Sequence, residues 1–163
     1  MSNNFGFTSA IKEGLRLGKE KLATKDRIND ILENFADELQ KILSDDSGQD
    51  IFVRKRHIII RKKLSRLATL ATVGFDEPPI EEEFEAVCLF NRNTINDPFV
   101  VFRYEIDPAN GFPCKIQYAS SSLSCKDEAT LILTIKEAVK YKGLAISEKV
   151  RELVNNSSKA EKR

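Results

Sequence analysis

The chain has 163 residues with 26 basic and 25 acidic side chains, which leaves a net charge of +1 at pH 7. A chain of this length folds as one ordinary domain and buries enough surface to need neither a structural metal nor disulfides. Hydrophobic residues make up 41% of the chain and charged residues 31%, which is typical of a globular protein and excludes a disordered or fibrous one.

The three cysteines, Cys88, Cys114 and Cys125, show no C-x-x-C spacing and would leave one thiol unpaired if two were bridged. This pattern favours a reducing compartment over a secreted disulfide framework. The N-terminus lacks the basic start and apolar core of a signal peptide, and no run approaches the ~18 apolar residues of a membrane span. We therefore expect a cytoplasmic protein without a membrane segment.

The N-terminal part of the chain predicts a loose, flexible arm over residues 1–7, followed by two helices. Gly14 and Gly18 weaken the first helix by about 1 kcal/mol each relative to alanine. Residues 25–43 repeat apolar side chains at spacings of three and four, which predicts a second helix with Thr24 as its N-cap. The serine- and aspartate-rich segment that follows should end this helix.

The region with the clearest period of two runs from residue 98 to residue 118. Alternation predicts that Val100, Phe102, Tyr104 and Ile116 share the buried face of two extended strands. The intervening Asp-Pro-Ala-Asn-Gly segment supplies residues that fix or tolerate turn geometry. The sequence therefore predicts an antiparallel hairpin with a five-residue loop at the middle of the sheet.

The remaining strands are predicted on either side of this hairpin. Residues 51–75 indicate one long bent strand or two strands, because β-branched side chains are frequent and a pair of lysines interrupts them. Residues 86–90 form a short apolar run typical of a central strand. Residues 76–85 are acidic and favour a solvated loop, and the serines at 120–124 favour a connector.

The C-terminal part predicts a helix over residues 126–141, with Ser124 in a capping box, and a short final helix that begins at Ser147. Residues 156–163 should form a disordered polar tail. We therefore expect a single α+β domain over residues 8–155. Its antiparallel β-meander of about five strands, within residues 51–119, would pack against the N-terminal and C-terminal helices.

Two clusters of like charge stand out in an otherwise balanced chain. The basic cluster spans residues 54–66, and the acidic cluster spans residues 76–85. The basic cluster suits a nucleic-acid surface, an edge strand protected from aggregation, or simple pairing with the acidic cluster. The residues that we expect to contact a partner are Arg54, Arg56, Arg61, Lys63, Glu81, Glu82 and Glu83.

The sequence offers little material for catalysis. His57 is the only histidine, so a histidine-based metal site cannot be built, and no phosphate-binding or hydrolase motif is present. Cys125 stands at the predicted start of a helix, where the helix dipole lowers the pKa of a thiol, and could pair with His57 as a nucleophilic dyad.

We therefore interpret the chain as a non-enzymatic macromolecule-binding protein without a metal or cofactor. The favoured function is protein–protein interaction of the inhibitor, immunity or chaperone type through charged surface patches, and a homodimer is compatible with it. The main alternative is a nucleic-acid-binding accessory protein that uses residues 54–66, and the minor alternative is a cysteine-dependent enzyme that uses Cys125.

Overall fold

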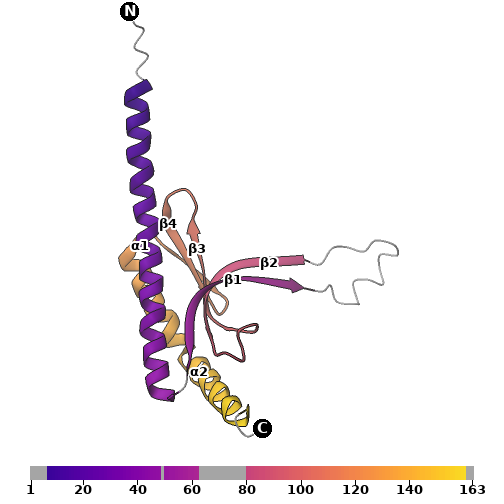
Figure 1. Cartoon of the computed structure of the whole chain (residues 1–163). Helices are drawn as coiled ribbons and strands as arrows, with labels where there is room; N and C mark the ends of the chain where they lie inside the picture. The colour runs from indigo at the N-terminus through magenta and orange to yellow at the C-terminus, as the bar shows by residue number, and fades with distance from the viewer. Residues whose placement is uncertain (1–6, 49, 63–79, 161–163) are drawn as a thin grey trace, which may run out of the picture.

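The computed structural model describes residues 7–48, 50–62 and 80–160, and it contains two long helices and five strands (Figure 1). The helices stand at the two ends of the chain, and the strands lie between them. The elements are α1 Phe7–Ser47, β1 Phe52–Lys62, β2 Ile80–Phe90, β3 Phe99–Asp107, β4 Gly111–Tyr118, β5 Ser121–Cys125 and α2 Glu128–Ala160.

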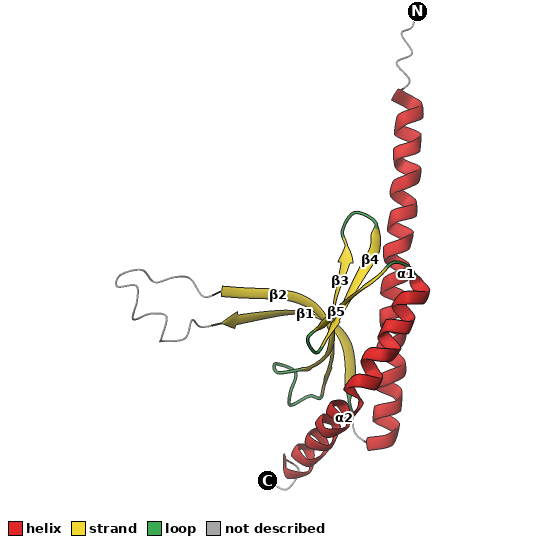
Figure 2. Cartoon of the chain, turned by 180° about the vertical axis from the view of Figure 1, so that it is seen from behind, coloured by secondary structure: helices red, strands yellow, loops and turns green. Residues whose placement is uncertain are grey.

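The five strands form one antiparallel sheet in the order β1-β2-β3-β4-β5. Each strand pairs with its neighbour in the sequence, and the three connections between β2 and β5 are shorter than the dozen or so residues that a crossover needs. Both helices cover the same face of this sheet (Figure 2). The α+β class and the antiparallel meander between two helical ends are therefore confirmed.

The main core fills the space between the sheet and the two helices. Phe102 of β3 is 1% exposed, and its ring lies 5.5 Å from the ring of Phe35 on α1. The opposite face of the sheet carries a smaller cluster around Ala86, Cys88 and Phe90. The largest fully buried side chains include Ile28, Leu32, Ile51, Leu89, Phe102, Ile116, Leu131 and Leu153.

The predicted alternation of β3 is wrong at Val100. The pairing with β2 shifts register between Val87 and Cys88, so Val101 is an extra residue in β3. Such a bulge turns the preceding residues to the other face. Phe102 and Tyr104 consequently lie in the main core as expected, whereas Val100 packs against the small cluster on the open face.

The two helices predicted in the N-terminal region are one continuous helix. Thr24 is not an N-cap, because its hydroxyl donates to the carbonyl of Glu20 inside the helix at 3.0 Å. Extension of an existing helix carries no nucleation cost, so Gly14 and Gly18 do not interrupt it. The predicted end is correct: Gly48 has φ +63° and its amide donates to the Ser44 carbonyl at 2.9 Å.

The predicted break near the end of the chain is also absent, since α2 is continuous from Glu128 to Ala160 and enters the segment expected to be a tail. The hydroxyl of Ser147 donates to the Gly143 carbonyl at 2.9 Å and caps nothing. The N-cap of α2 is Asp127, whose carboxylate accepts from the Thr130 amide at 2.8 Å, so Ser124 does not fill that position.

Two segments expected to be irregular are strands. The serine-rich residues 121–125 form β5, and residues 80–85 of the acidic segment belong to β2. In both cases pairing with a neighbouring strand overrides weak local propensity. Of the region 51–75, residues 52–62 form β1, and the remainder of the prediction for 63–79 lies outside the described residues.

The β3–β4 hairpin is confirmed, with a connection shorter than predicted. Asp107 pairs with Gly111, and the carboxylate of Asp107 accepts from the amides of Ala109 and Asn110 at 2.9 and 2.6 Å. Gly111 has φ +86°, a conformation that favours glycine, and it lies against the Thr24 side chain of α1. The turn therefore fixes the hairpin on the long helix.

Candidate functional site

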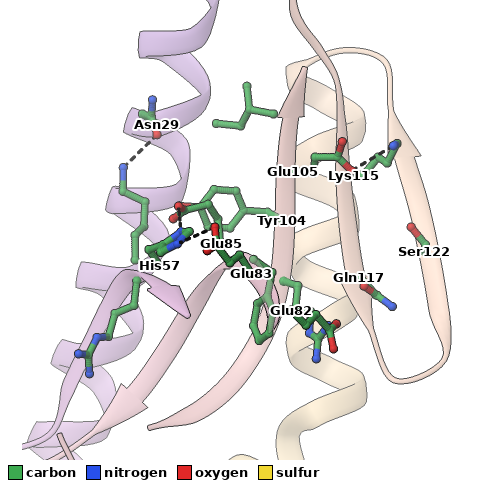
Figure 3. A pocket seen from close by; sticks show the side chains of 15 residues that line it. Asn29, His57, Glu82, Glu83, Glu85, Tyr104, Glu105, Lys115, Gln117 and Ser122 are labelled. Carbon is green, nitrogen blue, oxygen red and sulfur yellow. Dashed lines mark hydrogen bonds and ion pairs between the residues drawn. The ribbon is translucent and has the colours of Figure 1, made fainter. Parts of the chain in front are cut away.

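The described chain has a cleft of about 880 Å³ on the sheet, at the point where two strands separate (Figure 3). On one side is a projecting two-stranded segment, residues 57–62 of β1 and 80–84 of β2, which we call the ribbon. On the other side is the β3–β4 hairpin. The lining includes Lys55, His57, Glu83, Arg103, Glu105 and Lys115.

The cleft exists because β2 continues beyond the last residue that pairs with β3. Pairing of β2 with β1 continues to Ile80, opposite Lys62, but pairing with β3 stops at Glu85, opposite Tyr104. Among the described strands, residues 80–84 therefore pair only with β1, and the end of β3 pairs only with β4. Both strand edges that border the cleft lack a neighbouring strand there, and the ribbon points away from the helices (Figures 1 and 2).

The side chains of the ribbon pair acid with base across the two strands. The Arg61 guanidinium donates to the Glu81 carboxylate at 2.8 Å. The imidazole Nδ1 of His57 lies 2.8 Å from the carboxylate of Glu85, and its Nε2 lies 3.6 Å from Glu83. The only histidine of the chain is thus placed between two carboxylates (Figure 3).

The hairpin side of the cleft has the same mixed character, and its Arg103 side chain reaches across to the ribbon. Arg103 donates to Glu82 at 2.5 Å, and its guanidinium carbon lies 3.7 Å from the centre of the Phe84 ring, within the range of a cation–π contact. The Lys115 ammonium donates to Glu105 at 3.0 Å. These charged pairs are half-buried or exposed, so each is worth about 1 kcal/mol or less and can be exchanged for other partners.

The base of the cleft is closed by α1 and by one buried phenol. Lys55 extends from β1 to α1, where its ammonium lies 2.6 Å from Glu33 and 3.0 Å from Asn29. The hydrogen bond from this ammonium lowers the pKa of Glu33. Burial, followed by the nearby carboxylate of Glu85, raises the pKa of Tyr104 well above its usual range, so this phenol stays neutral.

The residues predicted to contact a partner have separate locations. Arg56, Glu82 and Glu83 line the cleft, and Arg61 and Glu81 pair further along the ribbon. Arg54 is elsewhere: it binds Asp37 at 3.2 Å and Gln40 at 2.7 Å on α1. Lys63 lies outside the described residues.

The residues predicted to contact a partner do not include the hairpin side of the cleft. Arg103, Glu105 and Lys115 belong to the hairpin that was identified from its alternation, and their side chains alternate with its apolar ones. The available signal was this outward-facing set of charged residues. In the sequence, Glu105 and Lys115 together with Asp107 faintly resemble the carboxylate–lysine set of a nuclease, an interpretation that the turn position of Asp107 disfavours. The set was not predicted to contact a partner because it is spread over two strands, whereas the basic and acidic clusters are continuous in sequence.

The dyad proposed for Cys125 does not form. Cys125 ends β5, at the opposite edge of the sheet from β1 and His57, and its buried thiol contacts the Thr134 hydroxyl at 3.4 Å. Burial also raises the pKa of the Cys114 thiol to about 12 and that of Cys88 to about 11. All three thiols are free and buried.

The described residues contain no group of three histidine, cysteine, aspartate or glutamate side chains that could hold a metal ion. None of the described helices combines the length and the apolar character that a bilayer-spanning helix requires. Comparison with protein-family models, with curated proteins and with solved structures finds no match for this chain. Its function must therefore be argued from the cleft and the surfaces themselves.

Proposed function

We propose that the chain is a non-enzymatic protein-binding module that holds an extended segment of a partner protein in the cleft between the ribbon and the β3–β4 hairpin. The observation that carries this proposal is the split of the sheet, because it leaves two strand edges facing one cleft. An extended peptide can add to such an edge through main-chain hydrogen bonds. Binding of this kind agrees with the inhibitor, immunity or chaperone type of function.

The charged walls supply the selectivity of such a site. Glu82 and Arg103, like Glu105 and Lys115, are bound to each other at the border of the cleft. A bound segment with alternating acidic and basic side chains can replace these pairs at little net cost. The partner we expect is therefore an extended segment of mixed charge, in place of one that is uniformly basic or acidic.

The contacts of His57 support a binding function over a hydrolytic one. Both ring nitrogens face carboxylates, Glu85 and Glu83, and neither is hydrogen-bonded to a described hydroxyl or thiol that could act as a nucleophile. General-base activation requires that contact. Cys125 is buried at the other edge of the sheet.

The alternative of nucleic-acid binding has less support, because Arg54, Arg56 and Arg61 of the basic cluster already have partners within the chain. Arg54 and Arg61 bind carboxylates, and Arg56 donates to the carbonyl of Ile95 at 2.5 Å. Binding to phosphates must weaken steeply as salt rises. A gel-shift titration with single- and double-stranded DNA and RNA at low salt tests this alternative, and we expect no retardation.

Affinity capture with the full chain, followed by mass spectrometry, tests the proposal. Arg103→Glu places like charge beside Glu82, and Glu105→Lys does the same beside Lys115. Arg92→Glu is the matched control, because Arg92 lies outside the cleft with its side chain 79% exposed. We expect wild type and the control to retain the same proteins and both cleft variants to lose them.

Circular dichroism must first show that all three variants keep the wild-type spectrum. Retention of the same proteins by the folded Arg103→Glu and Glu105→Lys variants would refute binding in the cleft. Retention of nucleic acid instead, with a steep loss between low and high salt, would favour the alternative.

A further inference from the structure

Two of the three cysteines face each other at the edge of the sheet. Cys114 of β4 and Cys125 of β5 are directly opposite in the register of these antiparallel strands. Directly opposite residues project to the same face of a sheet, with their Cα atoms about 4.5–5.5 Å apart. Both residues are 0% exposed and belong to the main core between the sheet and the helices. The two thiols are therefore neighbours in one apolar environment.

This placement meets the geometric requirement of a disulfide. Bridged cysteines have their Cα atoms about 4.4–6.8 Å apart and their Cβ atoms directed toward each other. A directly opposite pair on one face satisfies both conditions without a change of register. Burial, followed by the neighbouring Cys125, raises the pKa of Cys114 to about 12. The influence of Cys125 on this pKa agrees with two sulfur atoms that lie close together.

The third cysteine cannot take part in this pair. Cys88 belongs to β2, which is separated from β4 by β3. It packs with Ala86 and Phe90 in the small cluster on the open face of the sheet, whereas Cys114 and Cys125 face the helices. The chain therefore has one opposed pair of thiols and one isolated thiol that serves as an internal control.

The edge position of β5 gives an oxidant access to the pair. The strand has five residues, the first four are exposed, and among the described strands it pairs only with β4 (Figure 3). Short edge strands with few buried contacts open more readily than the centre of a fold. Separation of β5 from β4 uncovers Cys125 while the rest of the sheet stays paired. A small oxidant can therefore reach this thiol without global unfolding.

We propose that Cys114 and Cys125 are a reversible modification site that closes as a cross-strand disulfide in the presence of a low-molecular-weight disulfide such as glutathione disulfide. Cys125 loses its proton, and its sulfur attacks one sulfur of the oxidant, which releases one glutathione and leaves a mixed disulfide. The deprotonated sulfur of Cys114 then attacks the Cys125 sulfur and releases the second glutathione. Two protein thiols are oxidised, the oxidant is reduced to two thiols, and these take up the two protons.

The bridge would fasten the β4–β5 edge and the start of α2. It closes a loop of twelve residues, and Cys125 stands two residues before Asp127, the N-cap of α2. A cross-link over a loop of this length lowers the unfolding equilibrium constant about a hundredfold. Disulfides that form in a reducing compartment are mostly transient or redox-sensing. A pair that is free in the folded chain and closes on oxidation fits that use.

Oxidation of the reduced full chain with glutathione disulfide tests this proposal. After alkylation of the remaining thiols, peptide mass spectrometry should find Cys114 linked to Cys125, with the loss of two hydrogen atoms, and Cys88 alkylated. Dithiothreitol should restore three free thiols. The urea midpoint of the oxidised chain should exceed that of the reduced chain by about 1 M or more.

Three variants separate the two steps. Cys114→Ser should stop at the mixed disulfide on Cys125, because the second sulfur is missing. Cys125→Ser should form no bridge, and its urea midpoint should not rise on oxidation. Cys88→Ala is the matched control, since it removes a buried thiol on the other face, and it should form the bridge as wild type does. Circular dichroism should give the same spectrum for every reduced variant.

Three results would overturn the proposal. The first is a wild-type chain that stays fully reduced under native conditions and forms a bridge only in urea. The second is a native product in which Cys88 is linked as often as Cys125. The third is a Cys114–Cys125 bridge that lowers the urea midpoint, because the folded pair would then not accommodate a disulfide.

Discussion

The packing of the β3–β4 turn on α1 can be tested by replacing Gly111 with alanine. Gly111 has φ +86°, a region that costs a side-chain-bearing residue about 1–2 kcal/mol. A Cβ there would also lie 3.0 Å from the Thr24 methyl group and 3.4 Å from Ile28 Cδ1. Overpacking of this kind costs about 1–3 kcal/mol. We therefore expect Gly111→Ala to lower the free energy of unfolding by about 2–4 kcal/mol.

Urea unfolding measures this change. With a slope of about 1–3 kcal/mol per molar urea, the midpoint should fall by about 1–2 M while the slope stays constant. Gly143→Ala is the matched control, because Gly143 lies inside α2 and a Cβ added to it would meet nothing within 4 Å. This substitution should raise stability by up to about 1 kcal/mol through helix propensity alone.

A double-mutant cycle separates the two costs of Gly111→Ala. Thr24→Ser removes the methyl group that an alanine Cβ would approach and keeps the hydroxyl that donates to Glu20. In this background Gly111→Ala should cost at least about 1 kcal/mol less than in wild type, since only the backbone cost remains in full. An unchanged midpoint for Gly111→Ala would refute the constrained turn. A cycle without coupling would show that the turn does not pack on Thr24.

Phe102→Ala should lower the free energy of unfolding by about 3–5 kcal/mol in the same urea experiment, because Phe102 is 1% exposed. Ile59→Ala should change this free energy little, because Ile59 is 52% exposed. Similar losses for both variants would contradict the assigned core. The thiols of Cys88 and Cys114 have folded pKa values of about 11 and 12, above the ordinary value of 9.0. Their stabilisation is therefore complete below pH 9 and is lost as pH rises through the folded values, by up to about 1.4 kcal/mol per pH unit for each thiol. The urea midpoint should fall less between pH 8 and pH 10 in a Cys88→Ala variant than in wild type. An equal fall in both proteins would refute this assignment.

The meander could be predicted from the sequence because its central hairpin follows a local rule. Apolar side chains alternate through Phe102 and Ile116, and the turn between them holds the one glycine that the observed φ requires. The bulge at Val101 follows no such rule. One extra residue reverses which side of β3 faces the helices, and a run of adjacent valines contains no sign of where that happens.

The predicted breaks within the two helices are wrong for a different reason. Thr24 inside α1 and Ser147 inside α2 suggested the start of a new helix, but each helix also has a long packed segment from which it can extend without a new nucleus. Thr24 and Ser147 accordingly donate their hydroxyl protons to the preceding turn. Such residues favour caps only where an alternative to the helix is available.

The basic and acidic clusters could be identified from the sequence, but pairing between them was only one of three interpretations of the basic cluster. Arg61 and Glu81 are twenty residues apart, and their pairing depends on the register of β1 against β2. A tight turn would fix that register, but residues 63–79 separate the two strands, and charged side chains lie on both faces of β1, so the sequence specifies it only weakly. Once the register is known, much of the described part of both clusters is engaged in cross-strand pairs, and the region left for recognition is the opening between the ribbon and the hairpin.

The cleft and the overhang of α1 both result from elements that are longer than the layer they pack on. The 41 residues of α1 extend over about 60 Å, and its buried residues begin only at Ile28, so about half of the helix lies beyond the packed core. In the same way β2 continues past the last pair that it makes with β3. The exposed apolar side chains of the overhang and two unpaired strand edges both carry a free-energy cost in water that a second molecule can remove. The folded domain does not need the overhang of α1 for its own core, because the buried residues of α1 begin only at Ile28. In the ribbon, Ile58 and Phe84 pack against the small cluster on the open face. What the ribbon leaves for a second molecule is therefore the backbone edge of β2 beyond its last pair with β3, and this edge is the physical reason to expect that the cleft binds protein.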